Sequence, residues 1–215
     1  PAYQVAAADG HRASELRYCG HRVEPGKPAL DGLPATYVEA EDEADTLVLT
    51  LEDARQGLRV ELFYTLFADH AAIAQHAELH AIGDAPLRIE RAMSACAAFP
   101  GRDWHMLRLA GTWGRERGIE VVPLAQGLQA IESRRGSSGH QLNPFFALTE
   151  HGASEVHGAV YGFSLVYSGN HLGQVEVAAD YTARALIGLG SFDFAWTLAP
   201  GERFTTPEAV LVFSP

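Results

Sequence analysis

Residues 132–148, "ESRRGSSGHQLNPFFAL", concentrate hydrogen-bonding groups in one short connection. Arg134 and Arg135 carry planar guanidinium groups, which suit carboxylates and other oxygen acceptors. His140 and Asn143 add further polar groups before an apolar, strand-like run begins. Pro144 disfavours helical backbone at Asn143 and so fixes how the loop ends. Such a segment either binds a polar ligand or pins its loop to a neighbouring surface.

A second candidate element is the stretch "LAGTWGRERG" at 109–118. Trp113 lies between glycines and next to Arg115 and Glu116. A glycine-flanked indole can stand out from the surface and stack on a sugar ring, while arginine and glutamate side chains bind its hydroxyl groups. The sequence supports equally well a tryptophan in the core or in an interface, beside a surface ion pair.

Other patterns of chemistry are missing or cannot be assigned. His76 and His80 fall in a predicted strand, where a separation of four residues spans roughly 13 Å. One zinc ion holds its ligands near 2 Å, so we expect ordinary histidines and no metal site. The chain has no nucleophile elbow, phosphate loop or dinucleotide fingerprint, so we expect no cofactor. Acidic residues are plentiful, but no two can be paired as a catalytic dyad.

The elements that position these residues are predicted to be strands. Alternating apolar residues indicate a hairpin over 46–67 with the turn "ARQG", then strands over 72–82 and 87–99. Two further strands flank "SGNH", where Gly169 and Asn170 suit positive φ. Residues 183–215 predict three more short strands, with Phe192, Phe194 and Trp196 on a core face. Many short strands and no capped amphipathic helix indicate an all-β sandwich or barrel.

Composition narrows the class of protein. The 215 residues are 47% hydrophobic and 20% charged, which is enough for a sizeable core. A formal net charge of −11 argues against a nucleic-acid partner. No apolar run is long enough for a membrane span, and residues 1–12 lack a signal-peptide pattern. Cys19 and Cys96 are far apart in sequence, which predicts free thiols and a cytoplasmic location.

Several blocks resemble one known family. They are "RYCGHRVEPGKPALDGLPATYVE", "GTWGRERG", "ESRRGSSGHQLNPFFAL", "VYGFSLVYSGNHLGQVEV" and "FDFAWTLAPGERFTTPEAVLVFS". In this order they resemble the N-terminal domain of glycoside hydrolase family 36 α-galactosidases, over nearly the whole chain. The clearest departures are Gly139, Leu142, His171 and Gly173. None of them indicates a different family.

The resemblance implies a β-supersandwich fold of the galactose mutarotase type. In this family the sandwich precedes a (β/α)₈ barrel that carries two catalytic aspartates, one as nucleophile and one as acid/base. The implied reaction is retaining hydrolysis of terminal α-galactosyl units from sugars such as melibiose and raffinose. We expect residues 1–215 to form a single N-terminal sandwich domain, truncated at its start and ending before the barrel. We therefore expect no catalytic residue in this chain.

The resemblance also gives roles to the candidate residues. We expect Trp113, Arg115, Arg134, Arg135, His140 and Asn143 to lie at the barrel interface or at the rim of the substrate site. Docking on the missing barrel is favoured over substrate contact, and family membership implies a homo-oligomer. Two other classes stay open: a free-standing sugar mutarotase or epimerase, and a carbohydrate-binding module that uses Trp113.

Overall fold

The computed structural model describes residues 1–101 and 103–215 and is built almost entirely of strands. The only helix among these described residues is a short 3-10 turn, η1 (Glu41–Glu43). None of its described helices is long and apolar enough to cross a membrane. The all-β prediction is confirmed. Cys19 and Cys96 are both free, as predicted.

Sixteen described strands form two antiparallel sheets. The larger sheet has the order β2 (Arg17–Pro25), β3 (Ala44–Asp53), β4 (Leu58–Phe67), β5 (Ala72–Ala81), β16 (Glu208–Ser214), β11 (Val160–Val166), β10 (Leu142–Glu150), β7 (Trp104–Thr112) and β8 (Arg115–Pro123), with β15 (Arg203–Thr205) beside β5. The smaller sheet has the order β1 (Tyr3–Ala6), β6 (Leu87–Phe99), β13 (Ala183–Leu189), β12 (His171–Val177) and β9 (Gly127–Glu132), with β14 (Trp196–Leu198) beside β6.

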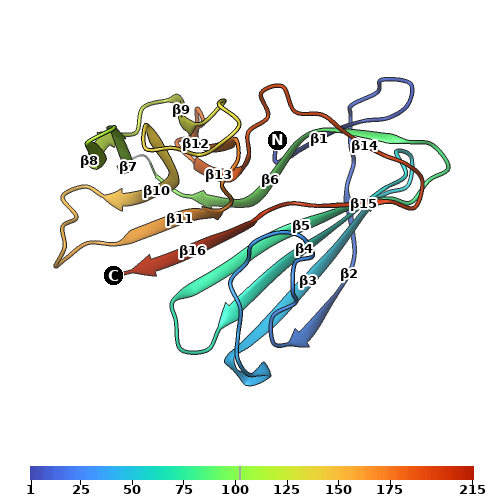
Figure 1. The fold of residues 1–215 in the computed structure, drawn as a ribbon, viewed down its shortest axis with the longest axis horizontal. Coiled ribbons are helices and arrows are strands. Elements are labelled where there is room, and N and C mark those ends of the chain that lie inside the picture. Colours follow the sequence, from blue (N-terminus) through green and yellow to red (C-terminus); the bar gives the residue numbers. More distant parts are fainter. Residues whose placement is uncertain (102) are drawn as a thin grey trace.

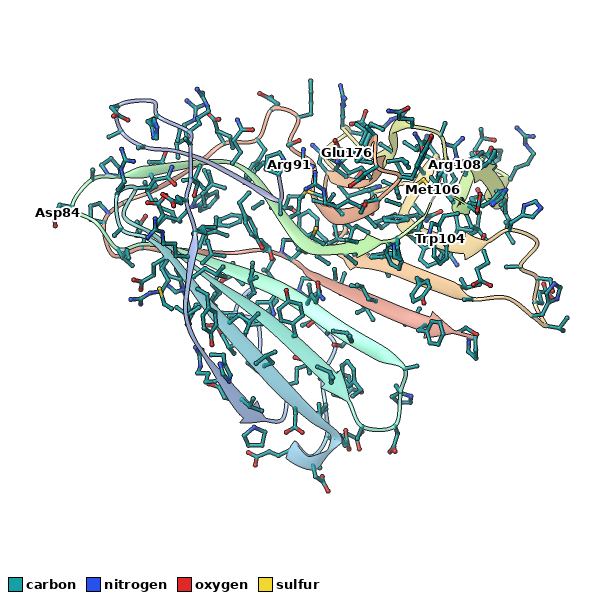
Figure 2. The ribbon with its side chains drawn as sticks, turned by 180° about the vertical axis from the view of Figure 1, so that it is seen from behind. Asp84, Arg91, Trp104, Met106, Arg108 and Glu176 are labelled. Carbon is teal, nitrogen blue, oxygen red and sulfur yellow. The ribbon has the colours of Figure 1, made fainter. Side chains whose placement is uncertain are left out.

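The two sheets pack face to face over two apolar clusters. One cluster joins β7, β10 and β11 of the larger sheet to β9, β12 and β13 of the smaller one, with Phe146 and Ile187 fully buried. The other joins β4 and β5 to β1, β6 and β14, around Val60 and Ile89. Figure 1 shows β2–β5 fanning away from the end that carries β7, β8 and β9. Figure 2, from behind, places Asp84 at one tip and Arg108 toward the other.

The strands predicted from alternation over 46–67, 72–82 and 87–99 are confirmed as β3, β4, β5 and β6. Residues 183–215 contain four strands rather than three, because β14 and β15 are separate segments of three residues each. Short edge strands of this length carry almost no periodic signal.

The interpretation of "SGNH" as a turn with positive φ is wrong. Neither Gly169 nor Asn170 has positive φ. The strands on either side, β11 and β12, belong to different sheets and do not pair with each other. The connection therefore crosses the sandwich, and a tight hairpin turn is not needed.

Candidate functional site

Most of the predicted site residues lie on two neighbouring loops at the end that carries β7 to β10. Trp113 and Arg115 belong to the β7–β8 hairpin, whose two-residue turn is Trp113-Gly114. Arg134, Arg135 and His140 belong to the segment between β9 and β10, called here the arginine loop (133–141). The two loops are joined because the Gly111 N–H donates to the Gln141 carbonyl at 3.2 Å.

Side chains of the two loops also interact electrostatically. The Gly114 N–H donates to the Glu116 carboxylate at 2.7 Å. Together with a smaller effect of His140, this hydrogen bond holds the pKa of Glu116 below its ordinary value. His140 therefore lies close enough to the hairpin of Trp113 to influence Glu116.

Trp113 is the most exposed aromatic residue of this end, with 88% of its surface accessible. A core role for Trp113 is therefore excluded. The hairpin can turn this tightly because residue 111 is a glycine. A Cβ at this position would meet the Arg115 carbonyl oxygen. Gly114 takes a φ of 79°, which glycine adopts without strain. An exposed indole on a tight turn suits either a protein interface or a sugar ring.

The two arginines of the arginine loop have different surroundings. Arg134 forms an ion pair with Glu132 at 2.8 Å, and its guanidinium lies 4.5 Å from the ring centroid of Phe192. Arg135 is exposed and has no ion pair or hydrogen bond to any described residue. Arg134 therefore stabilises the loop within the chain, and Arg135 is available to a partner.

Hydrogen bonds to the β11–β12 connection and to the first residue of β12 hold the backbone of the arginine loop in place. The Gly136 N–H donates to the Asn170 side-chain oxygen at 2.7 Å, and the Ser138 N–H donates to the Ser168 carbonyl at 2.7 Å. The Ser133 N–H donates to the His171 carbonyl at 3.0 Å. The role of Asn170 is thus to anchor the loop rather than to form a turn.

Asn143 is the second residue of β10, where the arginine loop ends. It is half-buried, and its side-chain oxygen has no hydrogen-bond partner among the described residues. The register between β10 and β7 shifts between Leu142 and Phe146, where Asn143-Pro144 interrupts the ladder. This irregularity is consistent with a proline that sets the direction in which the loop ends.

An aromatic groove lies beside the arginine loop, and sequence reasoning missed it. Phe192 and Trp196 are about half exposed rather than buried in a core face, so that prediction is wrong. The alternating pattern fails because 190–195 lie outside any strand, and the buried residue of β14 is Leu198. The groove has a volume of about 320 Å³, and its lining includes Tyr167, Asn170, Phe192, Phe194, Trp196 and Phe204.

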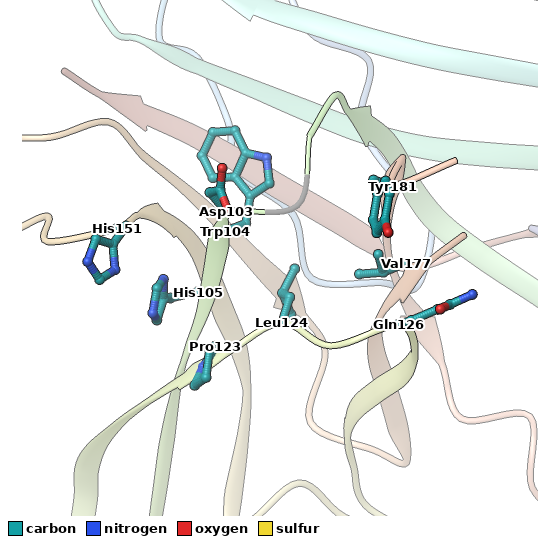
Figure 3. Close-up of a pocket in the computed structure, with 9 residues that line it drawn as sticks. All are labelled: Asp103, Trp104, His105, Pro123, Leu124, Gln126, His151, Val177 and Tyr181. Carbon is teal, nitrogen blue, oxygen red and sulfur yellow. The ribbon is translucent and has the colours of Figure 1, made fainter. Parts of the chain in front are cut away.

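A second hollow, of about 670 Å³, is lined by the start of β7, the β8–β9 connection and the β12–β13 connection. Figure 3 shows His105 and His151 on one side of it and Tyr181 and Gln126 on the other, with Leu124 between them. The two histidine rings are 5.2 Å apart between centroids. None of the predicted site residues lines this hollow, so it is separate from the arginine loop.

His171, whose carbonyl accepts the hydrogen bond from Ser133 of the arginine loop, is fully buried. Neither ring nitrogen has hydrogen-bond geometry to a described group. Burial is the largest influence on this side chain and lowers its pKa, while Glu132 and nearby backbone groups act in the opposite direction. His171 is therefore neutral in the folded chain near neutral pH.

The His171→Phe variant is expected to gain stability relative to the parent chain as the pH falls. An unfolded histidine protonates near pH 6.5, whereas the folded His171 resists protonation until lower pH. Below about pH 6.5 the unfolded state thus binds more protons, and the parent loses stability down to the folded pKa. Urea unfolding of both proteins near pH 7 and near pH 5 measures this difference. A difference that stays constant between the two pH values would contradict the expectation.

Comparison with known proteins identifies the family. Residues 1–199 match the family described as the glycosyl hydrolase family 36 N-terminal domain. This chain belongs to that family. The family 36 domain is 51% identical over 214 residues to alpha-galactosidase AgaA of Geobacillus stearothermophilus, and 37% identical to alpha-galactosidase Mel36A of Lactobacillus acidophilus. Each match covers 100% of this chain and 29% of the relative, so the chain spans less than a third of their length.

Solved structures agree with this family 36 assignment. The crystal structure of AgaA from Geobacillus stearothermophilus superposes with a TM-score of 0.98 over 100% of this chain and 30% of that chain. The galactosidase domain of the alpha-galactosidase-sucrose kinase AgaSK gives 0.96 at 35% identity, over 99% of this chain and 30% of that chain. A beta-arabinopyranosidase at 12% identity and a TM-score of 0.55 shares the fold alone. The predicted resemblance is confirmed, and the described strands contain no (β/α)₈ barrel.

Proposed function

We propose that this chain is the non-catalytic N-terminal sandwich domain of a retaining α-galactosidase that acts on terminal α-galactosyl units of the melibiose and raffinose type. Two aligned relatives are α-galactosidases, and variants of AgaA have been crystallised with raffinose and with stachyose. Residues 1–215 act as one domain, and the two catalytic aspartates lie on a barrel outside them. The domain needs no cofactor.

The end of the sandwich that carries Trp113 and the arginine loop is called here the loop end. Its partner is the enzyme's own catalytic barrel. The observation that carries this proposal is the exposure of Trp113 on a hairpin joined to the arginine loop, whose Arg135 has no partner among the described residues. An aromatic anchor and an unpaired guanidinium are typical of the centre of a protein interface. The same domain supports assembly of a homo-oligomer, and its two free thiols support a cytoplasmic location.

A chimera tests the docking role. The matched residues of the Geobacillus enzyme are replaced by this chain, and hydrolysis of p-nitrophenyl-α-galactoside is measured beside the isolated 215-residue chain. We expect turnover by the chimera and none by the isolated chain. Trp113→Ala in the chimera is expected to weaken the coupling of the two domains by about 2 kcal/mol or more, as for a central aromatic contact. The readout is the urea or thermal stability of the chimera, with KM measured in parallel.

Tyr37→Ala is the matched control, because Tyr37 is 78% exposed and lies outside the loop end. It is expected to leave both stability and KM unchanged. A Trp113→Ala chimera that keeps its stability but has a raised KM for raffinose would place Trp113 at the substrate rim instead. Turnover by the isolated chain would contradict the non-catalytic role. Saturable galactose binding by the isolated chain, lost in Trp113→Ala, would favour a carbohydrate-binding module.

A further inference from the structure

Two carboxylates and one histidine meet on the face of β4 and β5 that points away from Val60 and Leu79 of the core. Glu61 of β4 lies directly opposite Glu78 of β5 in the antiparallel register, and His80 follows two residues later on the same face. All three side chains are half-buried. One ligand atom from each of them lies within 4.8 Å of the others. This set is called here the carboxylate–histidine trio.

The distances within the trio match those around a tetrahedral metal ion. His80 Nε2 is 3.3 Å from Glu78 Oε2 and 3.5 Å from Glu61 Oε2. Metal bonds of about 2.0–2.1 Å at the tetrahedral angle place neighbouring ligand atoms about 3.3 Å apart. Two of the three distances between ligand atoms in such a site are therefore already present. Both distances are long for a hydrogen bond between nitrogen and a carboxylate.

The other oxygen of each carboxylate has its own partner. Arg22 Nη1 pairs with Glu61 Oε1 at 2.7 Å, and the Thr205 hydroxyl lies 3.4 Å from Glu78 Oε1. In both glutamates these contacts leave Oε2 facing His80. Outer contacts of this kind orient metal ligands in known sites. Arg203 is the exception, because its Nη1 lies 3.5 Å from Glu78 Oε2 and repels a cation there.

The surroundings of the histidine nitrogen also bear on what occupies the trio. His80 Nε2 is inaccessible to solvent and has no hydrogen-bond partner among the described groups. A buried nitrogen without a partner is costly unless something binds it. Two occupants can fill this role: a proton, which makes an imidazolium between two carboxylates, or a metal ion. The long distances and the tetrahedral spacing favour the metal.

We propose that Glu61, Glu78 and His80 bind one divalent transition-metal ion of the zinc type, with water in the fourth position. Nitrogen and carboxylate oxygen are ordinary zinc ligands, whereas Ca²⁺ takes six to eight oxygens and Mg²⁺ six. The ion joins β4 to β5 and, through Glu78 and Thr205, supports β15. The site lies on the β2–β5 half of the larger sheet, so it is independent of the arginine loop.

Zinc titration of the full chain tests the site. The protein is stripped with a chelator, and ZnCl₂ binding is followed by calorimetry, with metal content measured after dialysis. One Zn²⁺ per chain is expected, and it raises the unfolding temperature. Glu61→Gln, Glu78→Gln and His80→Ala are each expected to weaken binding at least about tenfold. Circular dichroism of each variant checks that the strands remain folded.

Two controls give the result its specificity. His70→Ala, on the same β4–β5 hairpin but outside the trio, is expected to bind zinc like the parent chain. Arg203→Gln is expected to bind zinc more tightly, because it removes the cation nearest to Glu78 Oε2. General damage to the fold cannot produce tighter binding. Absence of zinc binding by the parent chain, with a protonated His80 seen by NMR at neutral pH, would overturn the proposal in favour of an imidazolium ion pair.

Discussion

Glu208→Ala is expected to lower the free energy of unfolding by about 3–5 kcal/mol, because it leaves a buried ammonium group without its partner. The Glu208 side chain is fully buried, and that of Lys27, the chain's only lysine, is 2% exposed; Lys27 Nζ lies 2.6 Å from Glu208 Oε2. The Thr36 N–H and hydroxyl donate to Glu208 Oε1 at 2.7 and 2.8 Å. Loss of Glu208 thus leaves three donors unsatisfied. Urea unfolding of the chain measures the effect.

The matched control is an exposed pair of similar length. Arg184 and Glu176 form an ion pair of 2.8 Å in which both side chains are nearly half exposed, so Glu176→Ala is expected to cost less than about 1 kcal/mol. The double variant Lys27→Met, Glu208→Leu is expected to recover most of the loss, since it removes both charges. A cost for Glu208→Ala as small as that for Glu176→Ala would contradict the buried pair.

Phe146→Ala is expected to destabilise the chain by about 3–5 kcal/mol through lost burial and the cavity left behind. Phe146 is fully buried, and its ring stacks on Phe163 with centroids 4.8 Å apart. Its ring also lies 2.9 Å from the position of a Cβ on Gly173, so the larger sheet packs closely on β12 of the smaller one. The free energy of unfolding in urea is the measurement.

Phe145→Ala is the natural comparison, because it removes the same side chain one residue earlier on β10. Phe145 lies on the other face of the sheet and is only partly buried. Its truncation is expected to cost clearly less than that of Phe146. Equal costs for the two variants would mean that the core between the sheets is not where the structure places it.

Strands with one buried face could be predicted from the sequence. In β4, Leu58 and Val60 are buried against the core while Arg59 and Glu61 between and after them are only half-buried, and this alternation appears directly in the residues. The same logic failed for Phe192 and Trp196, whose alternation has no strand beneath it. A period of two indicates a strand only where a sheet supports it.

The candidate site was predictable in part. Trp113 and the arginine loop could be recognised by residue type, but their contact through Gly111 and Gln141 depends on how β7 and β10 pair. Within the carboxylate–histidine trio, Glu78 and His80 lie close together in the sequence, but Glu61 could not be assigned to them for the same reason. His76 and His80 can be compared along one strand, whereas Glu61 reaches His80 from β4, where the register between the two strands sets it opposite Glu78.

β16 pairs with β5 on one side and with β11 on the other, so it alone joins the two halves of the larger sheet. During synthesis β5 and β11 leave the ribosome well before residues 208–214. Until then, each half-sheet presents an unpaired edge that can associate with another nascent chain. Closure must also await contacts distant in sequence, which slows folding. Production of this protein is therefore most vulnerable to aggregation in the interval before β16 emerges, and slower synthesis lengthens that interval.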